Sequence, residues 1–388
     1  MLRKIGRILL FGLGIFILLG AVSALSNLGL PEQSRRPETL SDFQKAYLAE
    51  QFHLRRTLGN KIWPGWGEAE IPVIVYNGSY AFLVGHDGQP APGWNMVPDH
   101  EARGGAWQEV PEDVFFGEPY YRQPIPDQGE TPENFTVLVG DRWTASMMTR
   151  EYARIKMISD LQSDLPPVVR TVVPYRLVWR LVMGASETYI GGLAHESFHA
   201  YQGITLPEKL NAAERAYQWE SVYPLEQDAF GEAWEKELDL LRKAVMASSL
   251  EESRDLAEQF LAVREERRQQ AGLTYGALTY ERTREWLEGM AKYSELSLQR
   301  RAGADSEYRP LAALEEDPDF SDYRSRERYW KGQVNELQRM AGRDGDIRFY
   351  YSGFAQGVLL DRFLPGWKEK LWSEDVWLEE LLARSLEK

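Results

Sequence analysis

Residues 191–202 read GGLAHESFHAYQ, and they contain two of the five histidines of the chain. The apolar Leu193, Phe198 and Tyr201 favour a helix here. On a helix, His195 and His199 lie one turn apart and project from the same face. Two imidazoles at this spacing suit Zn²⁺, and Glu196 could act on a water held beside the metal. The segment therefore predicts a metal-binding helix.

Composition limits what surrounds this helix. The chain has 388 residues, 43% of them hydrophobic, which is enough for one large domain or two smaller ones. It has no cysteine, which excludes disulfides, thiolate metal sites and a cysteine nucleophile. Its net charge is −14, so we expect no nucleic-acid partner, because phosphate binding needs a basic surface.

A catalytic zinc site needs a third protein ligand. The other histidines, His53, His86 and His100, all lie upstream, and none follows His199. A downstream carboxylate is therefore the expected ligand. The candidates fall on three predicted helical stretches and are Glu214 and Glu220, then Glu226 and Glu232, then Glu281, Glu285 and Glu288.

Residues 288–295 read EGMAKYSE, and with the HExxH segment they resemble the gluzincin class of zinc metallopeptidases. The resemblance implies a zincin-like fold, Glu288 as the third zinc ligand and Glu196 as the general base. Residues 348–355, RFYYSGFA, are similar to a Y-x-x-G segment of the class, which implies that Tyr350 stabilises the oxyanion. Glu288 follows His199 by 89 positions, so a long helical insertion is expected between the two.

The first 25 residues differ from the rest. Arg3, Lys4 and Arg7 precede an uncharged, mostly apolar stretch over 8–25. Its length is at the lower limit for spanning a bilayer, and the charges place the N-terminus in the cytoplasm. We therefore expect a single-pass signal anchor at 1–25, a linker at 26–39 and an extracytoplasmic domain at 40–388. The alternative is a secreted protein, cleaved after Ala24.

The remaining pattern predicts an α+β fold that is mostly α. Apolar stretches at 71–76 and 80–84 flank Asn77-Gly78-Ser79 and predict a hairpin, 85–134 is rich in loops, and 135–140 is the last predicted strand. The domain thus divides into a β-containing part (40–140) and a helical catalytic body (141–388). Helices are expected near 40–58, 144–163, 169–182, 186–202, 209–247, 251–270, 278–302, 321–341 and 347–385, the last with a break at Pro365-Gly366. Arg264, Arg267 and Arg268 are interpreted as one exposed charged face with Glu251, Glu252 and Glu265.

These features together predict a membrane-anchored zinc metallopeptidase that acts on a peptide or protein substrate. The strand at 135–140 is the candidate edge for pairing with an extended peptide. Two alternatives remain open. One is a catalytically silent zincin-fold scaffold of the cell envelope, and the other is a zinc hydrolase acting on a substrate other than peptide.

Overall fold

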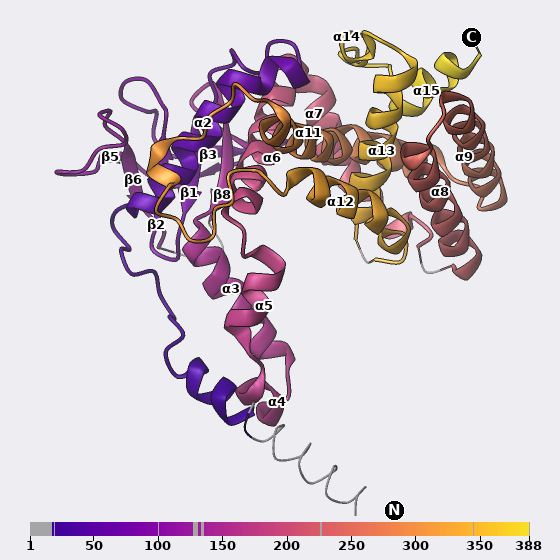
Figure 1. The fold of residues 1–388 in the computed structure, drawn as a ribbon. Helices are drawn as coiled ribbons and strands as arrows, with labels where there is room; N and C mark the ends of the chain where they lie inside the picture. The colour runs from indigo at the N-terminus through magenta and orange to yellow at the C-terminus, as the bar shows by residue number, and fades with distance from the viewer. Residues whose placement is uncertain are drawn as a thin grey trace, which may run out of the picture.

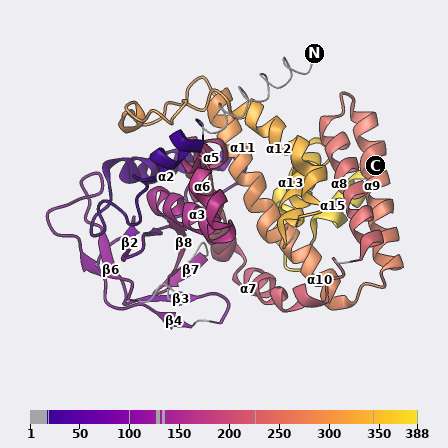
Figure 2. The ribbon, with the colours of Figure 1, turned by 90° about the horizontal axis from the view of Figure 1, so that it is seen from below.

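The structure is a computed structural model, and it describes residues 18, 20–99, 101–126, 131–132, 136–225, 227–343 and 345–387. It is an α+β protein with more helix than strand, as the sequence predicts. Figure 2 shows the sheet on one side and a large helical body on the other.

One mixed sheet forms the β part. Its strand order is β4-β3-β7-β8-β1-β2-β6-β5. The predicted hairpin is confirmed, because β1 and β2 pair antiparallel around Asn77, whose Oδ1 accepts hydrogen bonds from the Ser79 and Tyr80 amides. The strands are β1 (Val73–Tyr76), β2 (Tyr80–Val84), β3 (Trp94–Met96), β4 (Ala102–Arg103), β5 (Gln108–Glu109), β6 (Tyr121–Pro124), β7 (Thr136–Val139) and β8 (Arg142–Met148).

Two predictions about the strands are wrong. A helix was expected from residue 144, but Arg142–Met148 forms β8, which lies between β7 and β1, and helix α3 (Arg150–Asp164) begins only after the cap at Thr149. The strand at 135–140 is not an edge. Its described part, β7, pairs with β3 on one side and β8 on the other, so its backbone cannot accept a peptide strand.

Helices cover one face of the sheet, and a second core lies on the other face. Val73 and Val75 of β1 point into a core shared with α2 (Asp42–Ile62) and α6 (Ser186–Thr205), the helix that carries the HExxH segment. Ile74 and Tyr76 point the other way, into a second core that includes Tyr152 of α3. Strand β1 is therefore buried on both faces.

The helical body follows α6. The predicted helix over 209–247 is wrong as one element, because the segment forms α7 (Pro207–Arg215), the 3-10 helix η2 (Ala216–Val222) and α8 (Asp228–Met246), with Pro224 between η2 and α8. The break at Pro365-Gly366 is confirmed, with Gly366 at φ +77°. The remaining helices are α4 (Pro167–Val172), α5 (Tyr175–Met183), α9 (Leu250–Gln270), α10 (Tyr275–Arg284), η3 (Glu285–Gly289), α11 (Met290–Ala304), η4 (Ala312–Leu314), α12 (Arg326–Met340), α13 (Ile347–Phe363), α14 (Trp367–Leu371) and α15 (Leu378–Leu386).

Helices α3, α4 and α5 project from the body as an arm, and the N-terminal segment reaches the far end of that arm (Figure 1). Residues 20–27 are helical there, whereas 1–17 and 19 of the predicted anchor lie outside the described residues. Within the described ranges, no helix is both long enough and apolar enough to cross a bilayer.

Candidate metal centre

Helix α6 directs two imidazoles at one carboxylate. The Nε2 atoms of His195 and His199 lie 3.3 Å and 3.2 Å from the same oxygen, Oε2 of Glu288. The ligand atoms of the three residues all lie within 4.8 Å of one another, and all three side chains are buried. The predicted ligand set therefore comes together at one point, although 89 positions separate Glu288 from His199.

The other nitrogen of each imidazole is held by a second residue. Nδ1 of His195 lies 3.5 Å from Oε2 of Glu295, and Nδ1 of His199 lies 2.9 Å from Oε1 of Gln202. Such partners fix the ring orientation and leave Nε2 free to bind a metal. Neither Gln202 nor Glu295 was predicted to have a role. Gln202 follows His199 by three positions, so helical spacing alone could have identified it.

Glu288 lies in a π-helical turn, η3, between α10 and α11. Such turns recur at functional sites because they shift the side chains that follow them. Here the widened turn offers the carbonyls of Trp286 and Leu287 to Nε2 of Gln202, at 2.8 Å and 3.3 Å. The turn that carries the predicted third ligand, Glu288, is thereby hydrogen-bonded directly to α6.

A glycine contact sets the distance between η3 and α13. A Cβ atom on Gly353 would lie 2.5 Å from the carbonyl oxygen of Glu285 and 2.7 Å from Cα of Gly289. Only two glycines allow this approach. The contact gives a physical reason for the glycine in the EGMAKYSE segment and the glycine in the RFYYSGFA segment. It brings Glu288, directly before Gly289, close to Tyr350, three positions before Gly353.

Arg284 binds the oxygen of the Glu288 carboxylate that does not face the histidines. Its Nη2 donates to Oε1 of Glu288 at 2.6 Å and to Asp346 at 2.9 Å. Burial alone raises the pKa of Glu288, but the charges of His199 and Arg284 outweigh it and lower this pKa well below the usual range. One carboxylate oxygen is thus engaged by Arg284, and the other faces the histidines.

Glu196 and Tyr350 flank the triad. The ring of Tyr350 stacks nearly parallel on His195, with centroids 5.7 Å apart. Burial, together with the charge of Glu288, raises the pKa of Tyr350 well above its usual value, so the hydroxyl stays protonated. Burial likewise raises the pKa of the half-buried Glu196, while the two histidines oppose that rise.

The other candidate carboxylates do not reach the imidazoles. Glu214 faces Arg284 instead, with its Oε2 3.8 Å from Nη1 of that arginine. Glu220 and Glu232 are exposed, and Glu226 lies outside the described residues. Glu281 and Glu285 are buried but pair with arginines on the opposite side of their helix.

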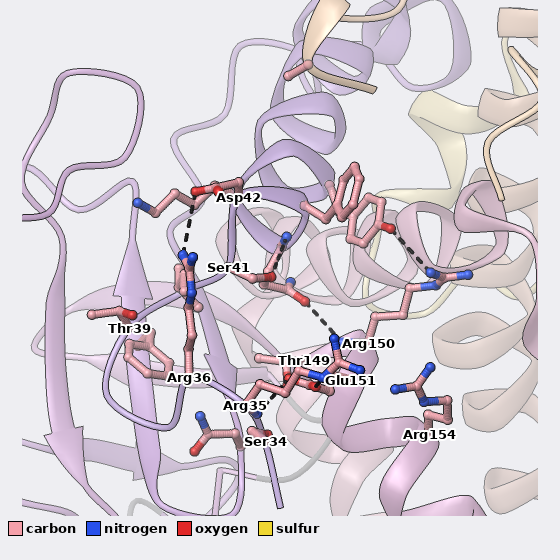
Figure 3. A pocket seen from close by; sticks show the side chains of 18 of the residues that line it. Ser34, Arg35, Arg36, Thr39, Ser41, Asp42, Thr149, Arg150, Glu151 and Arg154 are labelled. Atoms are coloured by element: carbon pink, nitrogen blue, oxygen red, sulfur yellow. Dashed lines mark hydrogen bonds and ion pairs between the residues drawn. The ribbon is translucent and has the colours of Figure 1, made fainter. Parts of the chain in front are cut away.

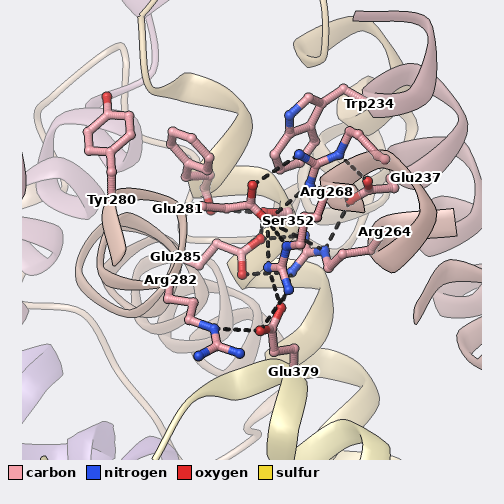
Figure 4. A network of polar contacts seen from close by, with 12 residues as sticks. Trp234, Glu237, Arg264, Arg268, Tyr280, Glu281, Arg282, Glu285, Ser352 and Glu379 are labelled. Atoms are coloured by element: carbon pink, nitrogen blue, oxygen red, sulfur yellow. Dashed lines mark hydrogen bonds and ion pairs between the residues drawn. The ribbon is translucent and has the colours of Figure 1, made fainter. Parts of the chain in front are cut away.

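The prediction that Arg264, Arg267 and Arg268 form an exposed face is wrong. Arg264 and Arg267 are 1% and 2% exposed, and the three arginines meet buried carboxylates from α8, α10, η3 and α15 (Figure 4). Arg264 donates to both oxygens of Glu285, at 2.6 Å and 2.9 Å. With Arg282 included, four arginines face four carboxylates, which are Glu237, Glu281, Glu285 and Glu379. Such balanced pairing is what permits ionic groups to be buried.

A separate open pocket of about 1120 Å³ lies between the 34–45 segment and α3 (Figure 3). None of the predicted site residues lines it. Its arginines are accompanied by acidic side chains, so it has no strong preference for one charge. The charged residues that line it are Arg35, Arg36, Asp42, Lys45, Arg150, Glu151, Arg154, Glu315 and Glu316.

Comparison with known proteins adds no relative. No known protein family, no curated protein and no solved structure matches this chain. The case for its function therefore rests on the His195, His199 and Glu288 cluster and the residues that support it.

Proposed function

We propose that the protein is a zinc metallopeptidase, anchored in the membrane, whose catalytic domain lies outside the cytoplasm. The observation that carries this proposal is the convergence of two imidazole Nε2 atoms on one oxygen of Glu288, at 3.3 Å and 3.2 Å. HExxH spacing on a helix with a distant glutamate is the arrangement expected of such an enzyme.

The donor set fits zinc. Two imidazole nitrogens and a carboxylate oxygen are ligands that Zn²⁺ accepts, and three protein ligands leave a fourth position open. The contacts of Glu295 and Gln202 with the Nδ1 atoms supply the support that metal-binding histidines ordinarily have. When bound, zinc would supply Lewis acidity that polarises a carbonyl and lowers the pKa of a water to about 7.

Side chains of the protein would supply the proton transfer and the stabilisation of the oxyanion. Glu196 follows His195 directly and is only half-buried, so its carboxylate can take a proton from a water at the site and deliver it to the leaving amine. Tyr350 would donate its hydroxyl proton in a hydrogen bond to the oxyanion that develops on the scissile carbonyl. The stacking of its ring on His195 supports this role.

Metal content and hydrolysis test the proposal separately. His195→Ala, His199→Ala and Glu288→Ala should each remove most of the zinc, measured by elemental analysis after dialysis. Glu196→Gln should keep the zinc and lose hydrolysis of a mixture of quenched fluorescent peptides. Glu214→Ala is the matched control, because Glu214 also faces Arg284 but does not reach the histidines.

Two results would contradict the assignment. Zinc retained by the histidine variants would contradict the proposed metal site. Hydrolysis retained by Glu196→Gln would contradict the role of Glu196 as general base. A wild-type protein that binds zinc tightly and cleaves none of the peptides would favour the scaffold alternative.

The location is proposed from the sequence of residues 1–25. Arg3, Lys4 and Arg7 precede the uncharged stretch and favour a cytoplasmic N-terminus. Protease added to spheroplasts should digest the domain and spare a cytoplasmic control protein. N-terminal sequencing then distinguishes an intact anchor from cleavage after Ala24.

A further inference from the structure

The tip of the arm has a composition unlike the rest of the chain. Residues 165–185 contain three arginines and no acidic residue, in a protein of net charge −14. Within the described part of the chain, none of the three, Arg170, Arg176 and Arg180, forms an ion pair. A positive segment without carboxylate partners, on so acidic a protein, indicates a surface with an anionic partner.

Helix α5 has apolar side chains on both its buried face and its exposed face. Tyr175 and Trp179, one turn apart, are buried against the protein. Leu177 and Leu181 lie on the opposite side of the helix, 51% and 78% exposed. One face of the helix therefore packs against the protein, and a second apolar face is exposed to solvent.

The neighbouring segments extend this outward face. Val169 and Val172 of α4 are 41% and 40% exposed. The side-chain amide of Asn27 donates to the carbonyls of Thr171 and Val173, at 3.2 Å and 2.9 Å, and so fixes the N-terminal segment to α4. Leu28 of that segment is 83% exposed at the same end of the arm.

We propose that the tip of the arm, residues 26–30 with 165–185, docks on the surface of an anionic phospholipid bilayer. Exposed leucines and valines would enter the boundary between headgroups and acyl chains, and the arginines would contact lipid phosphates. Residues 8–25, the proposed anchor, directly precede this surface in the sequence, so the docking rests on the proposed membrane location. A second copy of the chain is a poor occupant, because a symmetric contact would bring the unpaired arginines together.

The arm also sets a distance. Helix α3 has 15 residues, so it extends about 22 Å. Figure 1 shows α3 and α5 running from the body to the tip, with the sheet and helical body at the other end. Docking through the tip would therefore hold the body about one helix length from the lipid.

The absence of cysteine allows a direct test on the full chain. A nitroxide label is attached to Leu181→Cys, and to Tyr275→Cys as a control, because Tyr275 of α10 is 86% exposed and lies on the helical body. Each protein is placed with vesicles of phosphatidylcholine and phosphatidylglycerol, and power saturation compares collisions with oxygen and with a water-soluble nickel complex. The label at 181 should favour oxygen with vesicles and the nickel complex without them, while the label at 275 favours nickel in both.

Charge is tested by adding Arg170→Gln and Arg180→Gln to the labelled protein. Each arginine near an anionic surface contributes enough that the ratio of docked to undocked label should fall by about 30-fold for the pair. An unchanged ratio would overturn the proposed phosphate contacts.

Two other results would overturn the docking itself. One is a label at 181 that remains in water with vesicles present. The other is a label at 181 that is inaccessible to the nickel complex even without lipid, in a protein that sediments as a dimer. That result would show that this face is a contact between two copies of the chain. The docking rests on the proposed membrane location but on neither zinc nor hydrolysis, so its failure can be distinguished from failure of the proposed enzymatic function.

Discussion

Replacing Gly353 by alanine tests whether the glycine contact between α13 and η3 sets the geometry of the metal centre. The new Cβ would lie 2.5 Å from the Glu285 carbonyl oxygen and 2.7 Å from Cα of Gly289, and both are backbone atoms that cannot turn aside. An ordinary contact begins near 3.4 Å, so α13 and η3 must separate by roughly 0.9 Å.

The separation has two measurable costs. Overpacking of this kind lowers the free energy of unfolding by about 1–3 kcal/mol. Glu288 also lies in the displaced turn, and loss of support for a metal ligand weakens metal affinity by about 10–100-fold. We expect both effects in Gly353→Ala, measured by denaturant unfolding and by zinc competition against a chromophoric chelator.

Gly332→Ala provides the matched control. Gly332 also lies within a helix, α12, but a Cβ there would meet no atom within 4 Å. This variant should keep its zinc affinity and gain up to about 1 kcal/mol in stability, because alanine is the better helix former. Wild-type zinc affinity and unfolding in Gly353→Ala would refute the view that the glycine contact holds Glu288 in place.

Three further predictions concern single side chains. Glu295→Gln should weaken zinc binding by about 10–100-fold without unfolding the protein, because it removes the carboxylate at Nδ1 of His195; unchanged affinity in a chelator competition would contradict this. Tyr350→Phe should retain zinc and lower the turnover number for peptide hydrolysis by about 10²–10³-fold, the loss expected for one oxyanion donor, and an unaltered turnover number would exclude that role. Burial raises the pKa of Glu379, but the charges of Arg268 and Arg264 outweigh it and hold this pKa at about 2, below the unfolded value of about 4.3. Glu379→Gln should therefore cost up to about 3 kcal/mol of unfolding free energy above about pH 4.3, and its difference from wild type should vanish as the pH falls towards 2 in acid-dependent unfolding curves.

Local signals in the sequence predicted the local parts of the fold. Asn77-Gly78-Ser79 predicts the β1–β2 hairpin because the asparagine side chain itself forms the turn. Strand β8 was missed because its buried centre is Thr144, Ala145 and Ser146, which show no apolar alternation. Pairing on both sides makes this segment a strand, and pairing partners are not visible in a single stretch of sequence.

The candidate site divides in the same way. The spacing of His195 and His199 is a property of one helix, so it could be read directly. Glu288 could be found only through its motif, because the separation from His199 in sequence carries no geometric information. The buried arginines were misread for the same reason, since Arg264 pairs with Glu285 and Glu379, 21 and 115 positions away.

The π turn at Glu285–Gly289 fixes the rotational phase between α10 and α11. It contains one residue more than an α-helical turn, so the helix after it is rotated by about 100° relative to an uninterrupted α-helix. Glu281, before the turn, and Glu285, at its start, face the buried arginines, while Glu288, near its end, and Glu295, after it, face the histidines. One continuous α-helix could not serve both partners at once. A gene that lost the single codon for Leu287 would thus encode a more regular helix, in which the carboxylates on one side of the deletion no longer reach their partners.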